Sequence, residues 1–132
     1  MNKAEILVKL NALGWPPEDY WVVAGAAIVL YGLRAETHDI DLGCTPARAD
    51  ALEAAGVPFR RMDDGSGRWF NLSEDMEVFE NWLVDRVELV EGVPVVSLNG
   101  LREMKVALGR EKDRKDIALI DAFLQRGGRS DQ

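Results

Sequence analysis

Apolar residues recur along this chain with two different periods, one typical of helices and one typical of strands. The first block, residues 3–13, places leucine and isoleucine at helical spacing, and Gly14 suits the end of a helix. Later blocks predict helices at residues 46–55, 98–108 and 112–125. Shorter runs rich in valine and aromatic residues predict strands at residues 20–24, 39–42, 57–61, 68–72, 76–82, 87–90 and 93–96. We therefore expect an α+β fold, with a small mixed β-sheet and helices packed mainly on one face.

The stretch 22–42 is the most informative part of this pattern. It begins as a β-branched run, breaks at Gly25, continues with small and apolar residues, and ends in two aspartates separated by one isoleucine. This order predicts a strand, a tight turn, a short helix, a loop and a second strand. Residues i and i+2 of a strand point to the same face, so Asp39 and Asp41 should project together. Such neighbouring carboxylates repel each other unless a cation lies between them, and a divalent metal ion is the usual solution.

Composition limits the classes of protein to which the chain can belong. With 132 residues, 47% of them hydrophobic and 30% charged, it has the balance of one globular domain. We expect that domain to span residues 1–126 and the polar tail, residues 127–132, to be frayed. A formal net charge of −7 argues against a general nucleic-acid coat protein, because binding along phosphates needs a basic face.

The cysteine count and the N-terminal sequence bear on where the protein works. Cys44 is the only cysteine, which excludes an internal disulfide and indicates a reducing compartment, and we expect it to be a small buried residue. The first residues lead into an amphipathic pattern that predicts no signal peptide. No apolar run approaches the roughly 20 residues of a membrane span. The sequence therefore predicts a cytoplasmic protein that has no membrane partner.

A wider set of residues gives the two aspartates a chemical context. Gly25-Ala26, the short helix after them, Arg34 and the aspartate pair resemble the signature of the nucleotidyltransferase superfamily, the group with the DNA polymerase beta-type palm. The family pattern continues with a third acidic residue on a later strand, for which Glu77 is the candidate. Residues 94–124 are also similar to small bacterial single-domain members. Together these segments touch most of the chain.

The resemblance implies Mg²⁺-dependent transfer of a nucleotidyl group from a nucleoside triphosphate to an unidentified acceptor hydroxyl. Its catalytic and metal-binding residues would be Asp39, Asp41 and Glu77, with Glu77 also helping to deprotonate the acceptor. Such chemistry needs charge neutralisation at the α-phosphate, which Mg²⁺ ions held by carboxylates supply. Backbone N–H groups of Gly25 and Ala26, at the start of the short helix, would hold phosphate oxygens.

Basic residues are the remaining candidates for nucleotide binding, namely Arg34, Lys105, Arg110 and Lys112. Residues 102–116 hold six Lys or Arg and four acidic residues. The alternative interpretation of this run is a solvated helix face held by i,i+4 ion pairs. For Arg34 the alternative is an ion-pair partner that keeps the two aspartates charged.

Two positions depart from the family pattern. Ala26 stands where Gly or Ser is usual, and Glu77 stands where Asp is commoner. Alanine keeps the backbone N–H but disfavours positive φ, and the longer glutamate binds metal less rigidly. The competing third acid is Glu88, and the alternative for the aspartate pair is a solvated strand end. Trp69-Phe70, after a glycine turn, is a candidate lip of a pocket.

Two other functions stay open at this level. One is a non-catalytic or antitoxin-like protein of the same fold that acts through a protein partner, because small members of the group occur both as drug-modifying enzymes and as halves of toxin–antitoxin pairs. The other is a structural domain whose acids are incidental. The chain is too short to carry a large acceptor-binding domain. An enzyme would therefore use a small acceptor, or a homodimer or a cognate protein partner would complete the cleft for a macromolecular one.

Overall fold

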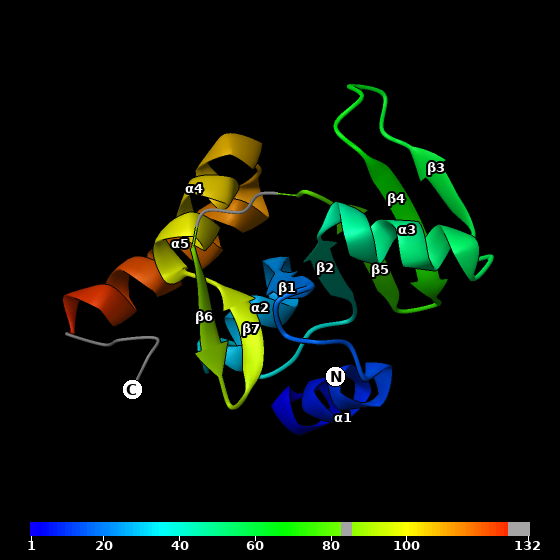
Figure 1. Ribbon diagram of the computed structural model, residues 1–132. Coiled ribbons are helices and arrows are strands. Elements are labelled where there is room, and N and C mark those ends of the chain that lie inside the picture. Colours follow the sequence, from blue (N-terminus) through cyan, green and yellow to red (C-terminus); the bar gives the residue numbers. More distant parts are fainter. Residues whose placement is uncertain (83–85, 127–132) are drawn as a thin grey trace.

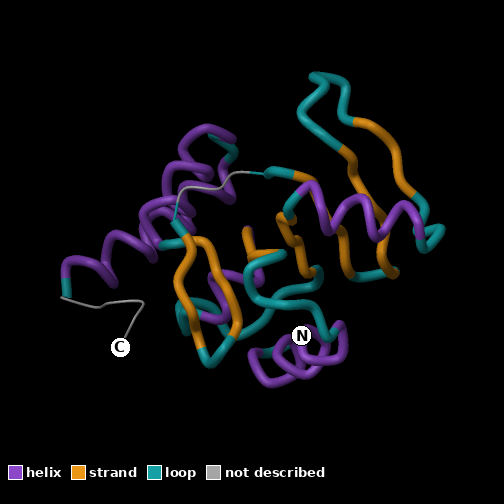
Figure 2. The backbone as a smooth tube through the Cα atoms, viewed as in Figure 1, coloured by secondary structure: helices purple, strands orange, loops and turns teal. Residues whose placement is uncertain are grey.

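The computed structural model describes residues 1–82 and 86–126, so the predicted frayed tail lies outside the described residues (Figure 1). Its helices are α1 (Lys3–Leu13), α2 (Ala24–Leu30), α3 (Pro46–Ala54), α4 (Leu98–Leu108) and α5 (Glu111–Gln125). Its strands are β1 (Tyr20–Val23), β2 (Ile40–Cys44), β3 (Phe59–Arg61), β4 (Arg68–Ser73), β5 (Met76–Glu80), β6 (Val87–Val90) and β7 (Val93–Val96). Figure 2 shows how these helices and strands alternate along the path of the chain.

All of these strands belong to one mixed sheet, in the order β3-β4-β5-β2-β1-β7-β6. At its centre β2 runs antiparallel to β1 and parallel to β5. On its other side β1 pairs in parallel with β7, which leads into α4. The predicted α+β class is confirmed, and the ends of the predicted elements shift by one or two residues.

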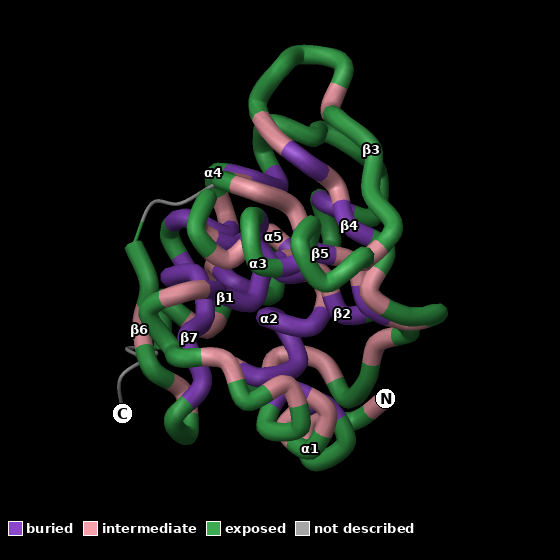
Figure 3. Tube along the Cα trace, turned by 45° about the vertical axis from the view of Figure 1, so that its right-hand side comes forward, coloured by how far each residue is buried: buried purple, intermediate pink, exposed green. Residues whose placement is uncertain are grey.

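The two faces of the central strands differ in what they carry. Ile40, Leu42 and Cys44 alternate along β2 toward one face and are 0% exposed. Arg68 of β4 lies on that same face and forms ion pairs with two acidic residues of α3, which places this helix over the strands β3 to β5. The buried parts of the chain gather at β1, β2, β7 and α2 (Figure 3). The opposite face of β2 carries Asp41, so the strand alternation separates the core from the candidate site.

Several helix ends agree with short-range chemistry. Asn2 and Glu5 form a capping box at the start of α1, and Gly14 ends that helix in the left-handed region at φ 67°. The Ser97 hydroxyl accepts a hydrogen bond from a backbone N–H at the start of α4, and Gly109 ends α4 at φ 62°. These local signals are the reason why sequence patterns located the helices well.

Three single-residue expectations have plain outcomes. Trp69 and Phe70 point to opposite faces of β4, so Phe70 is a core residue at 0% exposure, while Trp69 borders a cavity beside Arg60. Cys44 is buried as predicted, and burial raises the pKa of its thiol to about 12. No helix of the described residues is both long and apolar enough to cross a membrane.

Candidate active site

The two aspartates of the 22–42 stretch lie at the start of β2. Asp41 pairs in register with Val23 of β1 on one side and with Glu77 of β5 on the other. Asp39 directly precedes the strand. Within the described residues, no hydrogen bond or ion pair engages either aspartate carboxylate. Burial raises the pKa of Asp41 to about 6, and the negative charges of Glu77 and Asp39 add to the rise.

Glu77 lies beside Asp41 but takes part in a different contact. The indole Nε1–H of Trp69 donates a hydrogen bond to Oε2 of Glu77. Glu77 is not among the residues that line the cavity next to Asp41. Among the described residues, no three acidic, histidine or cysteine side chains are grouped as a ready metal site. The register thus brings the three predicted carboxylates near one another, without assembling them into a cage.

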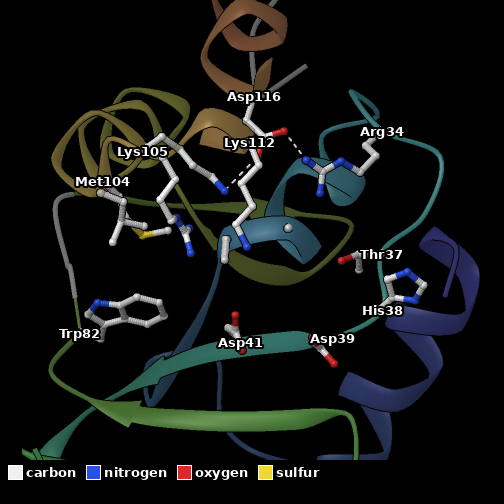
Figure 4. A pocket seen from close by; sticks show the side chains of 14 residues that line it. Arg34, Thr37, His38, Asp39, Asp41, Trp82, Met104, Lys105, Lys112 and Asp116 are labelled. Carbon is white, nitrogen blue, oxygen red and sulfur yellow. Dashed lines mark hydrogen bonds and ion pairs between the residues drawn. The ribbon is translucent and has the colours of Figure 1, made fainter. Parts of the chain in front are cut away.

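A cavity of about 360 Å³ opens over the two aspartates. Most of the predicted site residues border it: Gly25, Arg34, Asp39, Asp41, Lys105, Arg110 and Lys112. In Figure 4 the aspartates lie below, the two lysines reach down from above, and Arg34, Thr37 and His38 lie at one end. Ala26 does not border the cavity and is 0% exposed. The competing acid Glu88 lies on β6, where it accepts a hydrogen bond from the Tyr31 hydroxyl, and it does not border the cavity either.

The turn into α2 differs in detail from the prediction. The residue with positive φ is Ala24, the first residue of α2, at φ 58°, and Gly25 is the second residue of that helix. A non-glycine residue in this conformation costs roughly 1 kcal/mol or more. Space, not backbone conformation, accounts for glycine at Gly25, since a Cβ there would lie 2.8 Å from Oγ1 of Thr37 and 3.2 Å from Nη1 of Arg34. The close approach lets the loop after α2 form one end of the cavity.

The basic wall of the cavity is held by two buried aspartates that the sequence interpretation missed. Lys105 of α4 is only 4% exposed, and its Nζ lies 3.0 Å from Asp116 and 3.5 Å from Asp113 of α5. Arg34 also forms an ion pair with Asp116, so it is not the partner of the Asp39–Asp41 pair. Lys105 therefore does not lie on a solvated helix face.

Arg110 completes this network at the start of α5. Its guanidinium donates to both carboxylate oxygens of Asp113, at 2.7 and 3.1 Å. These hydrogen bonds, with the nearby Lys105 charge, hold the pKa of Asp113 at about 2, well below its usual range. One sequence signal pointed to this burial: Asp113 and Asp116 share the helical stripe of buried Ile120 at spacings of three and four residues.

Lys112 differs from the other cations of the cavity. It lines the cavity, and no hydrogen bond or ion pair engages its ammonium group within the part of the chain that the structure describes. Its charge nevertheless acts on Asp41, whose pKa it lowers slightly against the larger effect of burial. Among the described residues, the cavity therefore combines two aspartates that have no hydrogen-bond or ion-pair partner with a lysine that has none either.

Comparison with known proteins shows which solved structures share this fold. No protein-family model matches the chain, and no curated protein matches it. Among solved structures it is similar to ANT(2″)-Ia in complex with adenylyl-2″-tobramycin, with a TM-score of 0.58 and 17% identity, over 90% of this chain and 85% of that one. An antigenic nucleotidyltransferase-like protein from Paracoccidioides brasiliensis gives a TM-score of 0.46 and 18% identity, over 87% of this chain and 71% of that one.

This chain has a nucleotidyltransferase-like fold. The first similarity confirms the resemblance at the level of the fold. Carboxylate oxygens are the ligands that hard divalent cations such as Mg²⁺ bind, and such a cation often uses only one or two protein carboxylates together with substrate phosphates. Asp39 and Asp41 offer such oxygens, because no hydrogen bond or ion pair engages either carboxylate among the described residues.

Proposed function

We propose that this protein transfers a nucleotidyl group from a nucleoside triphosphate to an acceptor hydroxyl, with Mg²⁺. The observation that carries the proposal is the pair Asp39 and Asp41, unpartnered among the described residues, on the floor of a cavity with a basic wall. An acidic pair calls for a cation and a basic wall calls for an anion. A metal-bound triphosphate supplies both.

In this proposal the three acidic residues have different roles. Asp39 and Asp41 hold the metal, and Mg²⁺ would, when bound, neutralise the charge of the triphosphate. Glu77 lies next to Asp41 in register and serves as a further ligand and as the group that helps take the acceptor proton. Trp69 holds one Glu77 oxygen by its indole N–H, which leaves the other oxygen for that task.

The cations and the turn contact the phosphates. Lys112 has no ion-pair or hydrogen-bond partner for its ammonium group in residues 1–82 and 86–126, and it is the side chain that we assign to the triphosphate most directly. Arg34, Lys105 and Arg110 contribute positive potential from fixed positions, because buried aspartates already hold them. Gly25 borders the cavity near the start of α2, where its backbone N–H is our candidate phosphate donor. The buried Ala26 offers only its backbone N–H.

The acceptor is a separate part of the proposal. A cavity of about 360 Å³ is of the size that holds one small ligand, so a small acceptor would have to approach over its rim. For a macromolecular acceptor, a second copy of the chain or a cognate protein would complete the cleft. The acceptor is therefore proposed to bind outside the described cavity.

One observation favours a second candidate function. The Glu77 carboxylate is held by Trp69, and no three-ligand cluster is assembled among the described residues. A protein that kept this fold but acted through a protein partner would have no need of a complete metal site. Such a non-catalytic, antitoxin-like function makes the opposite prediction about metal-dependent nucleotide binding.

Calorimetry with ATP, GTP, CTP and UTP, each with and without Mg²⁺, tests the proposal. We expect at least one triphosphate to bind only with Mg²⁺, and binding to weaken about a hundredfold or more in the Asp39→Asn/Asp41→Asn variant, because the metal loses its carboxylates. Glu88→Gln is the matched control, since it removes an acid remote from the cavity. Absence of any metal-dependent binding, together with a stable complex with another protein, would instead support the partner-binding function.

A further inference from the structure

The candidate cavity has two chemically different ends. Arg34, Thr37 and His38 lie at one end, whereas Trp82 and Met104 lie at the other (Figure 4). Leu108 also lines the cavity and follows Met104 by one turn on the same side of α4. The apolar end thus consists of an indole ring, a thioether and a leucine side chain. Such a surface offers no favourable polar contact to a metal ion or a phosphate group.

The Trp82 side chain is held in place from outside the cavity. Its ring packs against Phe79, with ring centroids 4.4 Å apart and planes at 49°. Its backbone carbonyl accepts a hydrogen bond from Nε1 of Trp21 at 2.9 Å. Phe79 in turn stacks on Trp69, which binds Glu77. A ring fixed in this way loses little conformational freedom when a ligand packs against it.

We propose that the apolar end is the subsite for the nucleobase of the donor, with Trp82 as its stacking partner and Met104 and Leu108 as its wall. This inference rests on the proposed function. A nucleoside triphosphate has one charged end and one planar, largely apolar end. The cavity likewise has a polar end that suits the phosphates and an apolar end that suits the base. The phosphates would lie toward Arg34 and Lys112, across the two aspartates, and the base against Trp82.

The chemistry of this end also sets the expected base selectivity. Stacking on an aromatic ring is sequence-tolerant, because every base has a π-face. In Figure 4 the indole nitrogen of Trp82 lies on the side of the ring away from Asp41. Arg110, the polar residue nearest in sequence to Leu108 in the cavity lining, is already paired with Asp113. We therefore expect broad base tolerance, with purines favoured over pyrimidines by the larger stacked area.

A comparison of two ligands separates the base from the phosphates. In Mg²⁺ buffer, calorimetry would measure the binding of α,β-methylene nucleoside triphosphates and of inorganic tripolyphosphate, which has no base. Trp82→Ala should weaken the nucleotide about ten- to a hundredfold and leave tripolyphosphate within about twofold, since stacking is lost but the phosphate contacts remain. Trp82→Phe should keep most of the nucleotide affinity. Trp15→Ala, which removes a tryptophan outside the cavity, is the control.

The outcomes are distinguishable. Equal weakening of both ligands by Trp82→Ala, or no weakening of the nucleotide, would overturn the base subsite while leaving the proposed function standing. A preference for one base of more than about a hundredfold would also overturn it, because stacking alone does not discriminate so strongly. Failure of the unaltered protein to bind either ligand with Mg²⁺ would overturn the proposed function, and this inference with it. Tripolyphosphate binding by Trp82→Ala also shows that the variant is folded.

Discussion

Two pairs of aspartates lie at the candidate site, and they differ in their charged neighbours. Asp39, Asp41 and Asp116 border the cavity, whereas Asp113 pairs with Lys105 and Arg110 of its basic wall. Asp113 and Asp116 of α5 are almost fully buried, yet each has cationic partners within ion-pair distance. Asp39 and Asp41 are more accessible, yet neither has a hydrogen-bond or ion-pair partner among the described residues. The pKa values differ in the same sense: Asp113 is lowered to about 2 by Arg110, whereas Asp41 is raised to about 6 by burial and neighbouring acids.

This difference separates structural charge from functional charge. A buried ion pair with all its hydrogen bonds made contributes to the shape of the fold and needs no further ligand. Carboxylates that are held together without compensation cost free energy, which makes them candidates for a ligand-binding site. The first pair fixes the basic wall. The second pair is where we expect the cation.

The largest expected effect comes from breaking the compensated pair. Lys105→Met leaves Asp113 and Asp116 with one cation fewer in a buried position, so the free energy of unfolding should fall by about 2 to 4 kcal/mol. Denaturant titration would measure this fall. Lys112→Met is the matched control in the same cavity, and it should change stability by less than about 0.5 kcal/mol, because no partner is lost. Equal effects of the two variants would remove the distinction between paired and free cations.

Neutralising the uncompensated pair should have the opposite sign. Without Mg²⁺ at pH 7.5, Asp41→Asn should raise the free energy of unfolding by about 1 to 2 kcal/mol, since it removes a charge that burial and two other acids disfavour. The folded pKa of about 6 lies above the unfolded value of 3.8, so the raised pKa of Asp41 favours the folded state fully only below about pH 4. This contribution to the free energy of unfolding is lost as the pH rises through 6.

The gain from Asp41→Asn should therefore shrink between pH 7 and pH 4 and vanish near pH 4. Thermal or denaturant unfolding of both proteins across that range would measure it. Mg²⁺ with a nucleotide should stabilise the unaltered protein more than the variant. A variant that is less stable than the unaltered protein at pH 7.5 would show that Asp41 has a structural partner after all.

The free lysine of the basic wall should matter for binding alone. Lys112→Ala should weaken Mg²⁺-dependent triphosphate binding by about five- to tenfold, which is the loss of one charge-assisted contact. Calorimetry on the variant and on Lys115→Ala, a lysine of the same helix that does not line the cavity, would measure the difference. Identical affinities of the two variants would show that the α5 face is only solvated.

The smallest expected effect concerns Glu77. Trp69→Phe keeps a ring against Phe79 but removes the N–H that binds the Glu77 carboxylate. If that contact positions Glu77 toward the metal, the Mg²⁺ concentration for half-maximal nucleotide binding should rise about two- to threefold, a loss of less than 1 kcal/mol. An unchanged Mg²⁺ requirement would leave Glu77 outside the metal site.

The features that depend on local sequence could be predicted better than those that depend on contacts between distant residues. The helices and strands followed from period and caps, and the i,i+2 spacing of Asp39 and Asp41 placed both on the same face of a strand end. The resemblance also singled out Glu77, which lies in register with Asp41. These features depend on neighbours in sequence or on a recurring family order.

The network behind the basic wall could not be predicted in the same way. Arg34 and Asp116 are 82 residues apart, and a run of mixed charges on a helix usually indicates a solvated face. Lys105 was therefore expected as a phosphate contact or a surface residue. It is not a surface residue, because it is buried between Asp113 and Asp116, and it still borders the cavity. Trp82 packs against the core and also lines the cavity, and no local sequence pattern indicates the second contact.

The pKa of Asp41 tests the central claim most directly, because an uncompensated carboxylate and a paired one titrate differently. Carbon-13 NMR of the side-chain carboxyl groups would follow its titration without metal, and then with saturating Mg²⁺ and a nucleoside triphosphate. The account predicts a pKa of about 6 in the free protein and a fall below about 4 when the cation binds beside it. A pKa near the ordinary value in the free protein, unchanged by Mg²⁺ and nucleotide, would contradict the assignment of the aspartate pair as a cation site.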